Sequence, residues 1–268
     1  MAAVTDSVEE LLSYDSVNEN SPATILLIHG NGCGRADWNL VEPHLKDFNL
    51  LIPDLPGFAK SRHLAPFSLE RCAGFLNKLI SEKAIGGKAH VVGHSLGASV
   101  ALKLGSMYPE VVDTMLISGF LKLPKTVLTP VLPYAIWANS RFEDAMPRSL
   151  VSWLLDGTDI PRGDPKDRSL QRIRETFVDS LSPDGWPQPW RARTLVIAAT
   201  KRGILPSNDN VEQAVKVAEI GREQNSETYA VSHPDMRHAW PRQDPVLFAA
   251  TVRSFIMASD LPKGFHRL

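Results

Sequence analysis

The sequence has little cysteine: only Cys33 and Cys72 occur among its 268 residues. Two cysteines cannot build a disulfide framework, and they cannot form a cysteine-based zinc site. No histidine–carboxylate cluster has the spacing of metal ligands. The sequence therefore predicts neither a metal site nor a bound cofactor.

Long apolar runs and an excess of one charge are also missing. No window approaches 18 consecutive apolar residues, which argues against a membrane span. The polar, acidic stretch 1–20 lacks the pattern of a secretory signal peptide, so we expect a cytoplasmic location. The 29 basic and 30 acidic residues nearly cancel, which argues against nucleic-acid partners and against strong attraction to anionic membranes. The oligomeric state stays open.

Glycine is scarcer than proline, at 17 against 20, and the imbalance is concentrated in one stretch. Nine prolines but only three glycines lie between residues 121 and 190. Helix-like pieces occur there at 126–139, 142–155 and 166–181, and no convincing strand is present. We expect a core formed by residues 1–120 and 191–268, interrupted by a helical lid insertion at 121–190.

The rest of the chain alternates between apolar strand-like runs and helical patterns. Strands are predicted at 23–28, 49–54, 89–93, 112–118, 193–199 and 227–232, and helices at 68–83, 97–107 and 246–257. Such alternation implies right-handed crossovers and a mostly parallel sheet that is covered by helices on both faces. The predicted fold class is therefore α/β.

The sharpest chemical signal is Gly93-His94-Ser95-Leu96-Gly97, which has the form G-x-S-x-G. It follows a predicted strand and precedes a predicted helix, which is the context of a nucleophile elbow. Small residues flank the serine because the turn is strained. The pattern favours Ser95 as a nucleophile over an ordinary glycine-rich turn.

A second glycine-rich loop, His29-Gly30-Asn31-Gly32-Cys33-Gly34, follows the first predicted strand. A loop of this kind can direct backbone N–H groups at a developing oxyanion. The N–H groups of Asn31 and Leu96 are the expected pair. The alternative is a simple tight turn, but ligands bind at the carboxyl ends of strands in open α/β sheets.

The chain resembles the α/β-hydrolase superfamily over residues 23–258. The matching pieces are HGNGCG at 29–34, DLPGFAKS at 54–61, GHSLG at 93–97, and His238 with Pro245 seven residues later. The resemblance implies a nucleophile, an acid and a histidine in that chain order. It assigns Ser95 as the nucleophile and His238, after the last predicted parallel strand, as the general base.

The third member of such a triad departs from the family pattern. Relatives carry an aspartate in the loop after the strand at 193–199, and the corresponding position here holds Arg202. A cation cannot orient an imidazole N–H or stabilise an imidazolium. The remaining candidates are Asp209, just beyond that loop, and Asp235, three residues before His238. Asp209 is the preferred candidate, with a helix cap or a solvated loop residue as its alternative.

Arg202 raises a second hypothesis about the reaction. Near His238 it would disfavour the imidazolium form and leave the histidine neutral as a base. It could also bind an anionic group of the substrate. The site could then catalyse a condensation, cyclisation or elimination, as in specialised-metabolite biosynthesis, in place of hydrolysis.

The predicted lid insertion is rich in aromatic residues. It holds four of the six tryptophans, among them Trp137. Such rings suggest a small apolar or aromatic substrate, although they could equally hold the lid onto the sheet. Trp240 follows His238 closely and is expected to line the site as well.

Three functions remain open at this stage. The leading hypothesis is a serine hydrolase that cleaves an ester, thioester or lactone of a small apolar molecule. The second is a non-hydrolytic enzyme with His238 as its base. The third is a ligand-binding pseudoenzyme that keeps the pocket without turnover.

Overall fold

An eight-stranded sheet forms the centre of the computed structural model, which describes residues 11–123, 126–154, 158–161, 163–181, 185–202 and 208–268. The spatial order of its strands is β1-β3-β2-β4-β5-β6-β7-β8. The strands are β1 (Tyr14–Val17), β2 (Thr24–Ile28), β3 (Asn49–Pro53), β4 (Ala89–His94), β5 (Val112–Ser118), β6 (Arg193–Ala199), β7 (Tyr229–His233) and β8 (His266–Arg267).

The six inner strands, β2 to β7, are all paired in parallel, and the two edge strands are antiparallel to their neighbours. All residues of β2 and β3 are buried, as expected for parallel strands that are covered on both faces. Because parallel strands end at the same edge of the sheet, the loops after β2, β4, β6 and β7 open on one side of the molecule.

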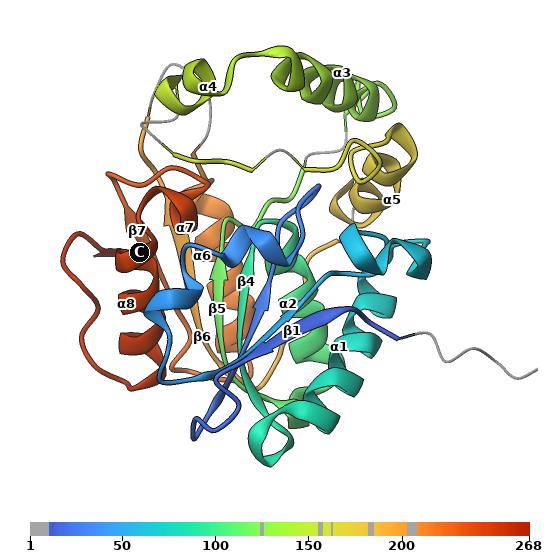
Figure 1. Cartoon of the computed structure of the whole chain (residues 1–268). Coiled ribbons are helices and arrows are strands. Elements are labelled where there is room, and N and C mark those ends of the chain that lie inside the picture. Colours follow the sequence, from blue (N-terminus) through green and yellow to red (C-terminus); the bar gives the residue numbers. More distant parts are fainter. Residues whose placement is uncertain (1–10, 124–125, 155–157, 162, 182–184, 203–207) are drawn as a thin grey trace, which may run out of the picture.

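Helices cover both faces of this sheet (Figure 1). One face packs against α1 (Leu69–Lys83), α2 (Leu96–Met107) and α6 (Val211–Arg222). The opposite face packs against α8 (Pro245–Ile256) through side chains such as Phe248 and Phe255. Successive strand residues alternate between the two cores: Leu26 belongs to the first and Leu27 to the second.

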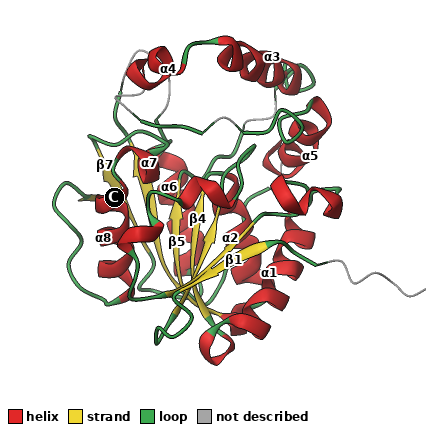
Figure 2. Cartoon of the chain, viewed as in Figure 1, coloured by secondary structure: helices red, strands yellow, loops and turns green. Residues whose placement is uncertain are grey.

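Three helices between β5 and β6 lie beyond the carboxyl ends of the strands (Figures 1 and 2). They are α3 (Leu132–Ala145), α4 (Arg148–Leu154) and α5 (Leu170–Leu181). Pro133 lies in the first turn of α3, where its missing N–H costs nothing. No strand occurs among the described residues of the stretch 121–190.

The strands and helices predicted for the core agree with the observed elements to within about two residues at most ends. The predicted elements do not include β1, β8 or α6. Strands β1 and β8 are short edge strands with little apolar alternation. Helix α6 has its buried residues at helical spacing, as at 214, 217 and 218, but it is not among the predicted helices. Among the described residues, no helix is long and apolar enough to cross a membrane.

Candidate active site

Ser95 occupies a strained turn between β4 and α2. Its backbone angles are φ 56° and ψ −118°, which lie in a region that residues other than glycine rarely adopt. The N–H of Ser95 donates to the carbonyl oxygen of Ser118 at 2.9 Å, which ties the turn to the end of β5. Leu96 then begins α2, so its N–H belongs to the first turn, where backbone donors lack an intrahelical acceptor.

The glycines around Ser95 allow backbones to approach closely. A Cβ atom on Gly97 would collide with the carbonyl oxygen of Ile28, and would lie only 2.8 Å from that of His29. A Cβ on Gly30 would lie 3.3 Å from the Cβ of Ser95. The turn that carries Ser95 and the glycine-rich loop after β2 therefore approach each other closely.

His29 holds the glycine-rich loop from inside the protein. Its side chain is fully buried, and its Nδ1 lies 2.8 Å from the carbonyl oxygen of Gly30. The N–H of Leu55 donates to His29 Nε2 at 2.9 Å, so Nδ1 carries the proton. Both ring nitrogens are thus used to fix backbone positions.

The structure places Asp209 directly against His238. Asp209 Oδ1 lies 2.5 Å from His238 Nδ1. The other carboxylate oxygen accepts the N–H of Ala199 at 2.8 Å, and the N–H of Asp209 donates to the carbonyl oxygen of Ala199 at the same distance. This double contact with the end of β6 holds the carboxylate in one orientation.

Asp209 also determines the electrostatics of His238. Burial lowers the pKa of His238, but the hydrogen bond and the negative charge of Asp209 more than offset this, so the pKa is raised. His94 packs against it, with the ring centroids 4.9 Å apart. Burial lowers the pKa of His94 well below its ordinary value, and the interaction with His238 lowers it further. His94 therefore stays neutral.

Gly119 makes room for the His238 ring. It has a positive φ of 67°, and a Cβ there would lie 2.7 Å from His238 Cε1. The sequence patterns do not indicate this role of Gly119. The sequence shows only that a glycine directly follows the strand at 112–118.

The two other charged residues considered for this position lie elsewhere. Asp235 is exposed. Arg202 is exposed too, and its charge is not among the causes that shift the pKa of His238. The expectation that Arg202 keeps the histidine neutral is therefore wrong, because the contact that dominates His238 is a carboxylate at hydrogen-bond distance.

A cavity of about 400 Å³ opens between these residues and the helical insertion. Asn31, Ser95 and His238 line it from the sheet side. The insertion contributes both apolar and charged side chains, including Ile136, Ile160, Ile173, Glu143 and Arg168. The charged members were not predicted, because no motif marks them.

Neither predicted tryptophan lines this cavity. Trp137 lies on α3 and is 40% exposed, while its neighbours Ile136 and Ser140 line the cavity. Trp240 is completely buried, and its Nε1 donates to Ser118 Oγ at 2.7 Å. The prediction that Trp240 lines the site is wrong: its ring packs against Phe248 and supports the end of β5.

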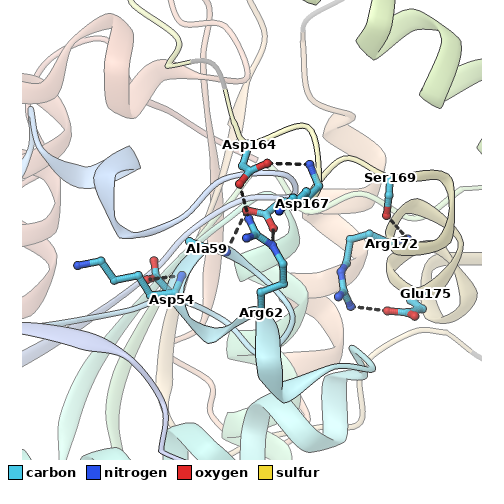
Figure 3. A network of polar contacts seen from close by, with 10 residues as sticks. Asp54, Ala59, Arg62, Asp164, Asp167, Ser169, Arg172 and Glu175 are labelled. Atoms are coloured by element: carbon cyan, nitrogen blue, oxygen red, sulfur yellow. Dashed lines mark hydrogen bonds and ion pairs between the residues drawn. The ribbon is translucent and has the colours of Figure 1, made fainter.

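A polar network joins the insertion to the loop after β3 (Figure 3). Arg62 reaches Asp164 and Asp167, both at 2.7 Å. The buried Asp167 also accepts the N–H of Ala59 at 2.9 Å. The insertion is therefore held against the sheet by ionic contacts next to the cavity.

No group of three or more histidine, cysteine, aspartate or glutamate side chains could hold a metal ion within the part of the chain that the structure describes.

Sequence comparison identifies relatives of this chain. A protein of Gibberella zeae named "AB hydrolase superfamily protein" is 32% identical over 264 residues, which is 98% of this chain and 89% of the relative. The pimeloyl-[acyl-carrier protein] methyl ester esterase of Methylococcus capsulatus is 32% identical over 194 residues, 68% of this chain and 70% of that protein.

Solved structures share the fold at low sequence identity. An epoxide hydrolase superposes with a TM-score of 0.67 at 16% identity, covering 92% of this chain and 95% of the other. A thermophilic esterase of Thermogutta terrifontis gives a TM-score of 0.62 at 18% identity, covering 92% and 93%. The sequence profile of the alpha/beta hydrolase family matches residues 25–251. The predicted fold is confirmed, and the chain belongs to the alpha/beta hydrolase family.

Proposed function

We propose that this protein is a serine hydrolase that cleaves an ester bond in a small molecule, with Ser95 as nucleophile, His238 as base and Asp209 as its acidic partner. The observation that carries the proposal is the 2.5 Å contact between Asp209 Oδ1 and His238 Nδ1. His238 lines the same cavity as Ser95, which sits on a positive-φ turn. Relatives named as an esterase and as lipases support the same reaction class.

Asp209 selects the tautomer that the reaction needs. Because its Oδ1 accepts the proton on His238 Nδ1, the Nε2 atom of the neutral ring is left as a proton acceptor. Nε2 then takes the proton of the Ser95 hydroxyl as Oγ attacks the ester carbonyl carbon. The imidazolium that forms is stabilised by the Asp209 carboxylate.

The negative charge that develops on the carbonyl oxygen needs preorganised donors. The N–H groups of Asn31 and Leu96 are proposed for this role. Leu96 begins α2, whose N-terminal partial positive charge favours an anion at this place. The glycines at 30 and 97 let the two loops approach closely enough for both donors to reach one oxygen.

The remaining steps follow from the same groups. His238 returns its proton to the leaving alcohol oxygen as the tetrahedral intermediate collapses, which leaves Ser95 acylated. Water, activated by the neutral His238, then attacks the acyl group and releases the acid. The helical insertion at 121–190 is proposed to act as the lid that covers these steps.

The non-hydrolytic hypothesis rested on an acid that was missing from its usual place. Asp209 supplies a carboxylate at His238, and Arg202 is exposed. No observation in the structure favours a condensation, a cyclisation or a binding protein without turnover over ester hydrolysis.

A fluorophosphonate probe tests the proposal directly. We expect intact-mass analysis to show one label on the wild-type protein and none on Ser95→Ala, and p-nitrophenyl butyrate hydrolysis to fall by about 10³-fold or more in this variant. Ser81→Ala is the matched control, because Ser81 is exposed on α1 far from any of these contacts. A wild-type protein that neither labels nor hydrolyses esters contradicts the proposal.

A further inference from the structure

Two smaller cavities continue from the active-site cavity along helix α2. The first, of about 50 Å³, is lined by Asn31 and Ser95, which it shares with the active-site cavity, and by Ser99. The second, of about 200 Å³, shares Leu96, Ser99, Leu121 and Thr176 with the first. We call this pair of cavities, from Ser95 to Ser106, the α2 channel.

We propose that the α2 channel binds the acyl arm of the ester, and that its length makes the protein selective for medium or long acyl chains. This inference rests on the proposed function, because it identifies the part of the substrate that lies on the acyl side of Ser95. The proposed binding site branches from the larger cavity beside His238 and shares Asn31 and Ser95 with it.

The floor of the channel is a stripe on α2 that carries serine at positions 99 and 106 and lysine at 103. Ser99, Lys103 and Ser106 follow Ser95 at spacings of three and four residues, so they lie on one face of the helix. These positions are half-buried, while most other residues of α2 are fully buried. Serine at 99 and 106 leaves space where a larger side chain would fill the channel.

The opposite wall is apolar and partly aromatic. Leu69, Phe120 and Leu121 line the second cavity together with Trp186. The rings of Phe120 and Trp186 stack with their centroids 6.0 Å apart. Thr176 and Gln188 line the same cavity, so it is this apolar part of the wall that favours a hydrocarbon chain.

The position of His238 distinguishes the acyl arm from the leaving group. His238 must give its proton to the leaving alcohol oxygen, so the alcohol lies in the larger cavity that His238 lines. Among the described residues, those lining the α2 channel include Ser95, Asn31 and Leu96 but not His238. The acyl arm, attached to the carbonyl carbon between Ser95 and the oxyanion donors, is therefore the arm that enters the channel.

The outer end of the channel is polar. Lys103 lines it and forms an ion pair with Glu70 at 2.5 Å. Ser106 is eleven residues beyond Ser95, a rise of about 16 Å along the helix axis, and Lys103 is eight residues beyond Ser95, a rise of about 12 Å. An extended acyl chain can therefore run about 12 Å along α2 before it reaches the ion pair of Lys103 with Glu70.

The test compares two blocking variants at different depths. Ser99→Phe should obstruct the channel close to Ser95, and Ser106→Phe should obstruct it near the outer end. The measurement is kcat/KM for p-nitrophenyl acetate, butyrate, octanoate and laurate, expressed as a ratio to the acetate value. Ser81→Phe, on the exposed face of α1, is the matched serine-to-phenylalanine control. Thermal unfolding of each variant verifies that it is folded.

We expect Ser99→Phe to reduce the octanoate and laurate ratios by at least about tenfold. Ser106→Phe should reduce only the laurate ratio, and Ser81→Phe should reduce neither. If the wild-type protein hydrolyses esters but both blocking variants keep its chain-length profile, or lose all chain lengths equally, the channel proposal is overturned while the proposed function stands. If the wild-type protein shows no Ser95-dependent hydrolysis, both proposals fail.

Discussion

Asp209 and His238 meet at 2.5 Å although 29 residues separate them in the chain. Asp209 follows β6 and His238 follows β7, and these two strands are neighbours in parallel. Their carboxyl ends therefore bring a carboxylate and an imidazole to the same edge of the sheet. The N–H of Ala199 holds the carboxylate of Asp209 and its carbonyl oxygen holds the N–H of Asp209, so both the side chain and the backbone of Asp209 are fixed beside His238.

Replacing Asp209 tests its role against the rival carboxylate. Asp209→Asn keeps the size of the side chain, but it can present an amide donor to His238 Nδ1 and favour the wrong tautomer. We expect kcat for p-nitrophenyl butyrate to fall by about 10⁴-fold, the loss typical of Ser–His–Asp enzymes. Asp235→Asn is the matched control and should retain nearly full activity, since Asp235 is exposed. Equal losses in both variants contradict the assignment.

The pH dependence of hydrolysis follows from the raised pKa of His238. Only the neutral imidazole can act as a base, so kcat/KM should fall as the pH decreases through a pKa above the ordinary value of 6.5. Asp209→Asn removes the hydrogen bond and charge that raise this pKa and leaves the lowering effect of burial. The acid limb of the residual activity should then move to lower pH. A limb that stays in place or moves upward would show that Asp209 does not control His238.

Glycine-to-alanine substitutions at 97 and 74 compare a position with tight packing on α2 with an open position on α1. A Cβ on Gly97 would collide with the backbone of β2, so Gly97→Ala should lower the free energy of unfolding by about 1–3 kcal/mol. A Cβ on Gly74 has ordinary contacts, the nearest atom being Tyr108 Oη at 3.8 Å. Gly74→Ala should therefore stabilise helix α1 by about 0.5–1 kcal/mol. Urea unfolding measures both values, and similar losses in the two variants would argue against this packing.

The ionic contacts between the insertion and the sheet can be tested with two aspartates. Asp167 is 3% exposed and serves both Arg62 and the N–H of Ala59. Asp167→Ala leaves the N–H of Ala59 without its acceptor and leaves Arg62 with Asp164 alone, so we expect a loss of about 1–3 kcal/mol in the free energy of unfolding. Asp164 is 43% exposed, and Asp164→Ala should cost at most about 1 kcal/mol. Denaturant unfolding distinguishes the two, and the reverse order would refute the importance of the buried contact.

The core strands and the nucleophile turn can be predicted because their signals are local. An apolar run such as 193–199 is buried on both faces wherever it pairs, and G-x-S-x-G between a strand and a helix requires a tight turn by its own composition. Edge strand β1 escapes prediction because Tyr14–Val17 carries little apolar alternation. It is defined only by its pairing with β3.

Closeness to His238 in the sequence does not by itself place a side chain in the site: Ala239, Pro241 and Arg242 line the cavity, but Trp240 does not. Trp240 is only two residues away, yet the short helix α7 (Trp240–Gln243) turns it into the core, where it donates to Ser118. Arg168 is seventy residues before His238, and it lines the same cavity. The distance of a residue from His238 along the chain therefore does not determine whether its side chain points into the cavity or into the core.

The sequence by itself determined the α/β fold, the position of Ser95 on its turn and the candidates for base and acid, because each depends on patterns within a few residues. Only the tertiary structure decided between Asp209 and Asp235, excluded Trp240 from the cavity and revealed the channel along α2. These properties depend on which strand ends lie side by side and which helix faces are left uncovered, and such distances arise only when the sheet and its helices pack together.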